Sequence, residues 1–377
     1  MTGKERLLLA FRNKQPDIVP IAPDIDLIGM RWWHEKTKKP WWNVFLYGDP
    51  SFEDVYIEAN KKLGCEIWDY FGRIRSESGV KSEKKIIAQT DAAITREVIA
   101  RTPYGDLRNV TAFPRDAPPW SMEKHVKDIH RDWPKLKWVM EQATFYPEIT
   151  ASSKVGESGV IGVTGRTPFP DFWVSCRGAE KAILDFYDYP ELMDDIFRFY
   201  RQYVSGFIKI AVQAKPEVIW IPGSSSSLSL ISPEIYRKYS LPIVREVTEL
   251  CKKAGVLSHA HTCGKSGKVV EMNYQETDLN IMEPLEGPPT GDMDLKAAKE
   301  KFGDKFCLKG NINTVLLHKG KPKDIKAAVQ QAIADAAPGG GFVLSTGDSP
   351  GSNTPDANIC AMVEAGREYG KYRLKCM

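Results

Sequence analysis

The sequence predicts an α/β fold of the (β/α)8 TIM-barrel type. From residue 154 onward, short apolar segments alternate with longer amphipathic segments, which indicates strands and helices that alternate along a parallel sheet. The strand segments are apolar without alternation, as expected where helices cover both faces of a sheet. The number of these repeats, in a chain of 377 residues, favours a closed barrel over an open sheet.

The first 70 residues contain two predicted helices and two predicted strands. The amphipathic pattern predicts helices over residues 5–12 and 52–63. Apolar runs predict strands over residues 18–22 and 66–70. No G-x-G-x-x-G motif follows the first strand, which disfavours a dinucleotide-binding fold.

An aromatic-rich segment lies between these elements, at residues 30–47, and is expected to be a loop. Its aromatic residues are Trp32, Trp33, Trp41, Trp42, Phe45 and Tyr47. Such a segment either forms a small satellite core or lines a pocket for a flat or methyl-bearing ligand.

The region from about residue 75 to 115 departs from the barrel repeat. Alternating runs at 85–88 and 95–100 lie beside turn residues, which is typical of antiparallel strands. We therefore expect an insertion of two or three strands within residues 79–113. A proline-rich connector at 114–120 and a helix at 133–141 follow it. The whole chain, residues 1–377, is expected to form a single barrel domain that contains this insertion.

The rest of the chain supplies the regular part of the predicted barrel. Strands are expected at residues 160–163, 217–221, 256–260, 279–282, 305–309 and 342–345. Helices are expected at residues 179–214, 233–254, 265–274, 294–302, 322–336 and 355–369.

Composition excludes several classes of protein. The 52 basic and 49 acidic residues leave a net charge of +3, which does not suggest a nucleic-acid or anionic-membrane partner. No apolar run approaches the roughly 20 residues that a membrane span needs, and the first residues lack the pattern of a signal peptide. The 7 scattered cysteines do not suggest a disulfide framework. We expect a cytoplasmic protein with reduced thiols.

The segment His261-Thr262-Cys263-Gly264 is the strongest indication of chemistry. Residues two apart on a strand point to the same face, so the imidazole of His261 and the thiol of Cys263 are expected to converge. Zinc prefers imidazole and thiolate ligands. Gly264 allows a sharp turn directly afterwards. A half-buried histidine and cysteine at a strand end, without a metal, is the alternative.

Polar residues follow the predicted strands, where a barrel carries its chemistry. Asp348 or Glu283 is expected to be the third metal ligand, since a catalytic zinc site has three protein ligands and an open position. Asp69, Glu283 and Arg166 are candidates for orienting a substrate. His259 shares the face of His261, either as a support or further ligand or as a core histidine that donates to a backbone carbonyl.

The chain resembles the uroporphyrinogen decarboxylase superfamily over nearly its whole length. The segments that carry the resemblance are 5–11, 231–234, 308–313 and 353–358. Members of the superfamily are distorted (β/α)8 barrels. Decarboxylases of the superfamily have a pair of arginines after the first strand, and segment 25–33 lacks that pair. The His-x-Cys-Gly motif at 261–264 is similar to that of the cobamide-dependent methyltransferase branch.

This resemblance implies a zinc-dependent methyltransferase that works with a corrinoid (cobalamin) held by a separate partner protein. In methylcobamide:coenzyme M methyltransferases, the third ligand is a cysteine at the position of Asp348, and a carboxylate there implies a harder site. A methoxylated aromatic is the expected methyl donor, in an O-demethylation. The resemblance also makes a homodimer plausible. A metal-free decarboxylase of a porphyrin-like or aromatic acid is the alternative, and a third hypothesis is a protein that binds a corrinoid or aromatic ligand without turnover.

Overall fold

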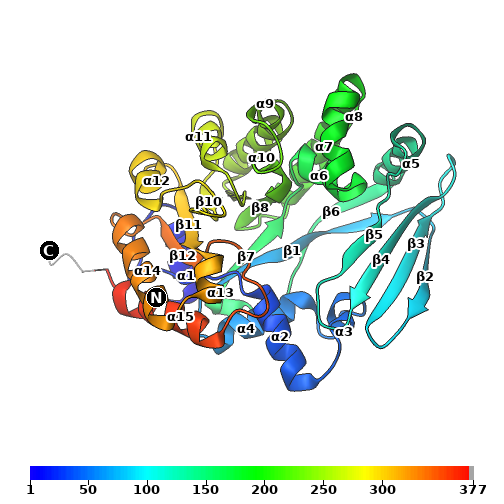
Figure 1. Cartoon of the computed structure of the whole chain (residues 1–377). Coiled ribbons are helices and arrows are strands. Elements are labelled where there is room, and N and C mark those ends of the chain that lie inside the picture. Colours follow the sequence, from blue (N-terminus) through cyan, green and yellow to red (C-terminus); the bar gives the residue numbers. More distant parts are fainter. Residues whose placement is uncertain (373–377) are drawn as a thin grey trace.

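The computed structural model describes residues 1–372 and shows an α/β fold with a mostly parallel main sheet, as the alternating pattern predicted (Figure 1). Its main sheet has 8 strands in the order β12-β11-β10-β9-β8-β7-β1-β6 within the described residues. All neighbours pair in parallel except β1 and β6. The strands are β1 (Ile67–Ser78), β6 (Ala143–Thr150), β7 (Gly159–Thr164), β8 (Val218–Pro222), β9 (Leu257–His261), β10 (Ile281–Glu283), β11 (Cys307–Ile312) and β12 (Phe342–Thr346).

Helices alternate with these strands along the chain and lie outside the sheet in Figure 1. They begin where the sequence offers good caps: the side chain of Asp294 accepts from the Ala297 amide at the start of α12, for example. The helices are α1 (Gly3–Phe11), α2 (Asp26–Thr37), α3 (Trp42–Phe45), α4 (Phe52–Lys62), α5 (Ile129–Glu141), α6 (Phe169–Arg177), α7 (Ala179–Asp188), α8 (Pro190–Gln213), α9 (Pro233–Ile235), α10 (Leu241–Ala254), α11 (Gly267–Glu276), α12 (Leu295–Phe302), α13 (Thr314–Lys319), α14 (Pro322–Ala336) and α15 (Asp356–Tyr369). Among the described residues, no helix has both the length and the apolar character needed to cross a membrane.

A buried cluster joins α1 to side chains from most strands of the main sheet. Phe11 of α1 packs edge-on against Trp68 of β1, with ring centroids 5.4 Å apart. Gly162 of β7 leaves room for that indole, since a Cβ there would lie 2.3 Å from the Trp68 ring. The full cluster is Leu7, Ala10, Phe11, Ala22, Trp68, Val160, Val218, Ile281, Cys307 and Val343. The strands therefore share one interior, which α1 covers at one end.

A second sheet of four antiparallel strands projects from the body of the molecule beside α5 (Figure 1). Its strands are β2 (Ser82–Gln89), β3 (Ala93–Ala100), β4 (Leu107–Pro114) and β5 (Trp120–Glu123). Three of these strands, β2 to β4, lie where the sequence predicted two or three strands within 79–113, and β5 adds a fourth strand after the predicted proline-rich connector. The extension of β1 to Ser78 and its partner β6 were not predicted.

The predicted loop at 30–47 is wrong, because α2 and α3 cover most of that segment. Met30, Trp41 and Val44 are buried against Val55 of α4 in a separate small core. Gly29 brings α2 so close to α4 that a Cβ there would lie 2.9 Å from Ala59 Cβ. The satellite-core interpretation therefore describes this part of the segment.

The predicted strand at 18–22 is present only as two isolated bridges, Ile18 with Lys371 and Ile21 with Leu344. Pro20 interrupts it, since proline has no backbone N–H to donate. The segment nevertheless reaches both ends of the parallel strand order. Leu344 N–H donates to Pro20 O on one side at 2.9 Å, and Glu66 N–H donates to Ile21 O on the other at 3.0 Å.

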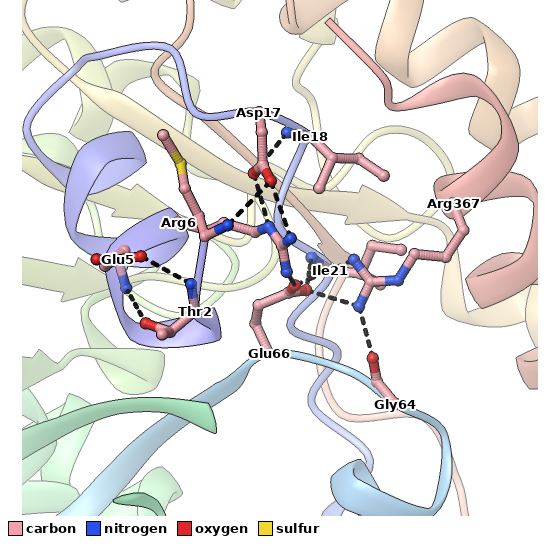
Figure 2. A network of polar contacts seen from close by, with 10 residues as sticks. Thr2, Glu5, Arg6, Asp17, Ile18, Ile21, Gly64, Glu66 and Arg367 are labelled. Carbon is pink, nitrogen blue, oxygen red and sulfur yellow. Dashed lines mark hydrogen bonds and ion pairs between the residues drawn. The ribbon is translucent and has the colours of Figure 1, made fainter. Parts of the chain in front are cut away.

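Glu66 fixes this junction through its buried carboxylate (Figure 2). The carboxylate accepts from the Ile21 amide at 2.8 Å, from Arg6 of α1 at 3.2 Å and from Arg367 of α15 at 2.9 and 3.0 Å. Arg367 also donates to Gly64 O at 2.6 Å. One carboxylate therefore ties the first and last helices to the start of β1.

We predict that Glu66→Gln lowers the free energy of unfolding by about 3 kcal/mol, because it leaves the half-buried Arg367 guanidinium without its anion and removes one of the two carboxylates that pair with Arg6. Chemical denaturation monitored by circular dichroism measures this loss. Glu271→Gln is the matched control, since Glu271 also bridges two cations, Lys268 and Lys301, but at the surface. Equal stability losses in the two variants would contradict the role given to Glu66.

Candidate metal centre

Three side chains with metal-binding atoms meet at the carboxyl ends of the parallel strands. His261 is the last residue of β9, Cys263 lies in the loop that follows, and Asp348 follows β12. One ligand atom from each of these residues lies within 4.8 Å of the other two. The two strands are not neighbours in the sheet, so the sequence-distant Asp348 reaches the pair across β10 and β11.

The His261 ring is held by Glu283, its strand partner on β10. His261 Nδ1 lies 3.3 Å from Glu283 Oε1, which also accepts from Trp220 Nε1 at 3.0 Å. The other ring nitrogen, Nε2, lies 4.0 Å from Asp348 Oδ1. Burial opposes protonation of His261, but contacts with Cys263 and Glu283 outweigh it and raise its pKa well above the usual value. Glu283 thus contacts Nδ1 of His261, and the opposite ring nitrogen, Nε2, faces Asp348.

The loop that carries Cys263 turns sharply at Gly264, where φ is +74°. A Cβ at this position would lie 2.6 Å from Ser229 Oγ, so the site needs glycine for space as well as for conformation. The Gly264 amide donates to the buried carboxylate of Glu286, and the Lys265 amide donates to Ser229 Oγ at 3.0 Å. The loop is therefore fixed on both sides of the turn, and Cys263 itself is half-buried.

The serine run at 224–229 supports this loop. The Leu228 amide donates to Lys265 O at 3.0 Å, so the run and the loop lie side by side. Ser232 caps α9 by accepting from the Ile235 amide. Asp171 of α6 holds the other end of the run, since its carboxylate accepts from Ser226 Oγ. Burial raises the pKa of Asp171 to about 6.

Asp348 has a backbone conformation that side chains rarely adopt, with φ at +144°. Its carboxylate accepts from the Ser349 amide at 2.8 Å. The preceding amide, of Gly347, donates to Ile312 O of β11 at 2.7 Å. The Asp348 side chain is 37% exposed, in contrast to the buried His261, so the ligand group is open to solvent on the Asp348 side.

A buried charged layer lies beside His261, and sequence reasoning missed its central member, Lys309 of β11. The fully buried Lys309 Nζ donates to Asp24 at 2.9 and 3.1 Å and to Glu283 at 2.6 Å. Burial disfavours the ammonium, yet the two carboxylates outweigh it and raise the Lys309 pKa. The predicted strand at 305–309 has a lysine at each end, so its pattern does not mark Lys309 as the buried one.

His259 is a core residue of β9 with no exposed surface. Its ring stacks on Trp68 with centroids 4.9 Å apart, and Nε2 lies 3.3 Å from Glu283 Oε2. Neither ring nitrogen has a hydrogen bond within the described residues, which corrects the expectation of a bond to a backbone carbonyl. Desolvation by burial lowers the His259 pKa.

Two of the three residues predicted to orient a substrate, Asp69 and Arg166, contact residues other than the three candidate ligands. Asp69 of β1 is buried; its carboxylate accepts from the Phe71 amide at 2.9 Å, and burial raises its pKa to about 8. The guanidinium of Arg166 packs on Phe145, Tyr203 and Phe207, 4.3–5.3 Å from the ring centroids. Of the three, Glu283 is the one that contacts His261.

The aromatic segment at 30–47 also takes part in a cavity, but away from these ligands. Trp32 and Trp33 of α2 line a space of about 580 Å³ between α2 and α4, together with Lys36 and Lys62. The Lys62 ammonium lies 4.0 Å from the centroid of the Trp32 ring. The six cysteines of the described residues are free thiols, and Cys376 lies outside that part of the chain.

Comparison with known proteins places the chain in a family. Residues 121–369 match the family model of uroporphyrinogen decarboxylase (URO-D). The chain is 28% identical over 181 residues to the methylcobamide:CoM methyltransferase MtbA of Methanosarcina mazei, covering 48% of this chain and 49% of that protein. It is 23% identical over 273 residues to the uroporphyrinogen decarboxylase of Methylibium petroleiphilum, covering 68% and 70%. The chain spans about half the length of the first of these relatives.

A solved structure shares the fold. The chain superimposes on a methyltransferase from Methanosarcina mazei with a TM-score of 0.63 and 18% identity, covering 98% of this chain and 99% of that one. The chain therefore belongs to the uroporphyrinogen decarboxylase family, and its likeness to the methylcobamide:CoM methyltransferases supports the cobamide-dependent methyltransferase branch of that superfamily.

Proposed function

We propose that this protein is a zinc-dependent methyltransferase that moves a methyl group between a small methylated substrate and a separate corrinoid protein. The observation that carries the proposal is the approach of His261, Cys263 and Asp348 to within 4.8 Å. One nitrogen, one sulfur and one oxygen donor with an open fourth position is a ligand set suited to catalytic zinc. The names of the Methanosarcina relatives, methylcobamide:CoM methyltransferases, support the corrinoid partner.

Zinc held by these ligands would supply Lewis-acid polarisation of a substrate oxygen and stabilise it as a leaving group. The residues of the chain prepare that position. Glu283 fixes the His261 ring so that Nε2 is the nitrogen available to the metal. The Cys263 thiolate and the Asp348 carboxylate would balance the charge of a dication.

The donor set favours an oxygen substrate over a thiol. A carboxylate at Asp348 makes the site harder than one with two thiolates, and hard centres prefer oxygen groups. We therefore propose a methoxylated aromatic as methyl donor, with a phenolate as the product of O-demethylation. A decarboxylase would not need this ligand group, so metal analysis separates the two functions.

The proposal extends to the architecture. The segment from Pro20 to Ala22 bonds to both ends of the parallel strand order, and α1 shares one interior cluster with most strands. These contacts support a distorted (β/α)8 barrel in which residues 75–115 are an insertion. The family resemblance also underlies our proposal that the chain forms a homodimer.

We predict that the purified protein contains about one zinc ion per chain, and that Cys263→Ala and His261→Ala both lose it, because each removes one of three ligands. Elemental analysis by plasma mass spectrometry measures the content. Cys360→Ala is the control, since Cys360 is an exposed free thiol on α15. A metal-free wild type, or a Cys263→Ala variant with full zinc content, would sink the metal centre.

We also predict that the zinc-loaded protein transfers a methyl group from 2-methoxyphenol to free cob(I)alamin, giving methylcobalamin and the phenolate. The absorbance of methylcobalamin follows the reaction. Cys263→Ala is expected to slow it by roughly 1000-fold, which corresponds to the loss of about 4 kcal/mol of Lewis-acid stabilisation. If coenzyme M accepts methyl groups from methylcobalamin while aryl methyl ethers remain inert, the proposed substrate class is wrong.

The buried ammonium of Lys309 gives a prediction on stability. Lys309→Met leaves Asp24 and Glu283 as neighbouring buried carboxylates without a cation, so the free energy of unfolding should fall by about 3–5 kcal/mol. Adding Asp24→Asn should restore part of the loss. Lys301→Met, at an exposed ion pair, is the control. Denaturant titration of the wild type, the two single variants and the double variant measures these free energies. A Lys309→Met variant as stable as the wild type would contradict the ion pairing.

A further inference from the structure

We propose that Arg31 of α2 is a positioning residue that holds Asp348 at the metal centre by fixing the loop from 347 to 355. This inference rests on the proposed function, because it takes Asp348 as a zinc ligand. His261 and Cys263 lie on β9 and the loop after it, whereas Asp348 lies on a separate loop, which needs its own support.

The Asp348 loop needs external support because its backbone is strained. A residue other than glycine with φ at +144° keeps that conformation only where its surroundings fix it. On the N-terminal side, the Gly347 amide is bonded to Ile312 of β11. On the C-terminal side, the loop is bonded to α2.

Helix α2 contacts the loop at successive points along its length. Its first residue, Asp26, accepts from Ser349 Oγ, next to Asp348. One turn and a half further along, Arg31 Nε donates to Ser352 O at 2.7 Å, and Arg31 Nη2 donates to Thr354 O at 3.3 Å.

The end of the loop is fixed by the same helix. Arg31 Nη2 also donates to the carboxylate of Asp356, the first residue of α15. Trp32 Nε1 donates to the same carboxylate at 2.9 Å. A planar guanidinium can serve several acceptors in fixed directions at once, which a lysine ammonium on a flexible chain does less well.

The helix that carries Arg31 is itself a rigid support. Met30, next to Arg31, is buried with Trp41, Val44 and Val55. Gly29 lies against α4, where a Cβ would be 2.9 Å from Ala59. Movement of α2 would therefore disturb a packed core, so the Arg31 side chain reaches the loop from a fixed base.

Removal of the guanidinium should affect Asp348 and spare the other two ligands. Without Arg31, the Ser352 and Thr354 carbonyls lose their donor, and the contact of Ser349 with Asp26 is left to hold the loop between Asp348 and Thr354 against α2. His261 and the Cys263 loop keep their own supports, Glu283 and Glu286. The expected result is a metal centre that retains nitrogen and sulfur ligands but holds the carboxylate weakly.

Titration of the metal-free protein with Co²⁺ tests this, because cobalt reports both affinity and ligand set through its absorption. We expect Arg31→Ala to raise the Kd for Co²⁺ about 10-fold, as loss of a supporting contact typically does. The sulfur-to-cobalt absorption of Cys263 should persist. Arg31→Lys should lie between Arg31→Ala and the wild type. Arg75→Ala is the matched control, since Arg75 pairs with Glu77 and Glu148 on the β1–β6 ribbon.

A double-mutant cycle with Asp348→Asn decides whether Arg31 acts through Asp348. We expect Asp348→Asn alone to weaken Co²⁺ binding, and Arg31→Ala to have no further effect on binding when Asp348→Asn is already present. If Asp348→Asn weakens binding while Arg31→Ala binds like the wild type, or if the two effects multiply, the role of Arg31 is wrong. If the wild type shows no sulfur-to-cobalt absorption, the proposed metal centre fails instead.

Stability needs a separate check, since Arg31→Ala also removes an ion pair. Thermal unfolding of the metal-free proteins shows whether the variant is folded at the titration temperature. Should it unfold, Arg31→Lys replaces it, because it keeps a cation beside Asp356 but loses the fixed geometry of the guanidinium. Arg31→Lys must then weaken Co²⁺ binding in the wild-type background but not in the Asp348→Asn background, and any other pattern overturns the inference.

Discussion

The candidate centre depends on the contacts that the Glu283 carboxylate makes with its neighbours. It is buried at the end of β10, and its two oxygens meet groups from three other strands: Trp220 of β8, His261 of β9 and Lys309 of β11. A buried carboxylate is stable only when it is paired and hydrogen-bonded. The positions of these partners are therefore coupled. The orientation of the His261 ring depends on Glu283 of the neighbouring strand β10, which is itself held by Trp220 and Lys309.

Parallel topology explains why this set of residues can assemble at all. Strands that run in the same direction end on the same side of a sheet, so residues far apart in sequence come together at their carboxyl ends. Lys309 and Asp24 are separated by 285 positions in the chain and still form a direct ion pair. The centre proposed here combines this charged layer with two loops, one after β9 and one after β12. The first is fixed by Glu286 and the serine run, and the second by α2.

The parts of the fold that follow from periodicity were predictable from the sequence. The strands and helices after residue 154 repeat a local pattern, and β9 with its His261 end follows from that pattern alone. The prediction of a loop at 30–47 is wrong because clustered tryptophans do not exclude a helix: Trp32 and Trp33 lie on α2, and Trp42 begins α3. The segment at 18–22 forms only isolated bridges because Pro20 has no backbone N–H to donate to a partner strand. Lys309 could not be assigned, because a buried lysine is recognised by the distant carboxylates that neutralise it.

The ligand set combines features that sequence could and could not supply. Spacing alone indicated that His261 and Cys263 converge, and the structure brings Asp348, rather than Glu283, into the group with them. X-ray absorption spectroscopy at the zinc edge tests whether His261, Cys263 and Asp348 bind the metal. We expect one sulfur neighbour at about 2.3 Å and nitrogen or oxygen neighbours at about 2.0–2.2 Å. A spectrum with no sulfur neighbour would contradict the role of Cys263, and one with two would contradict the carboxylate of Asp348.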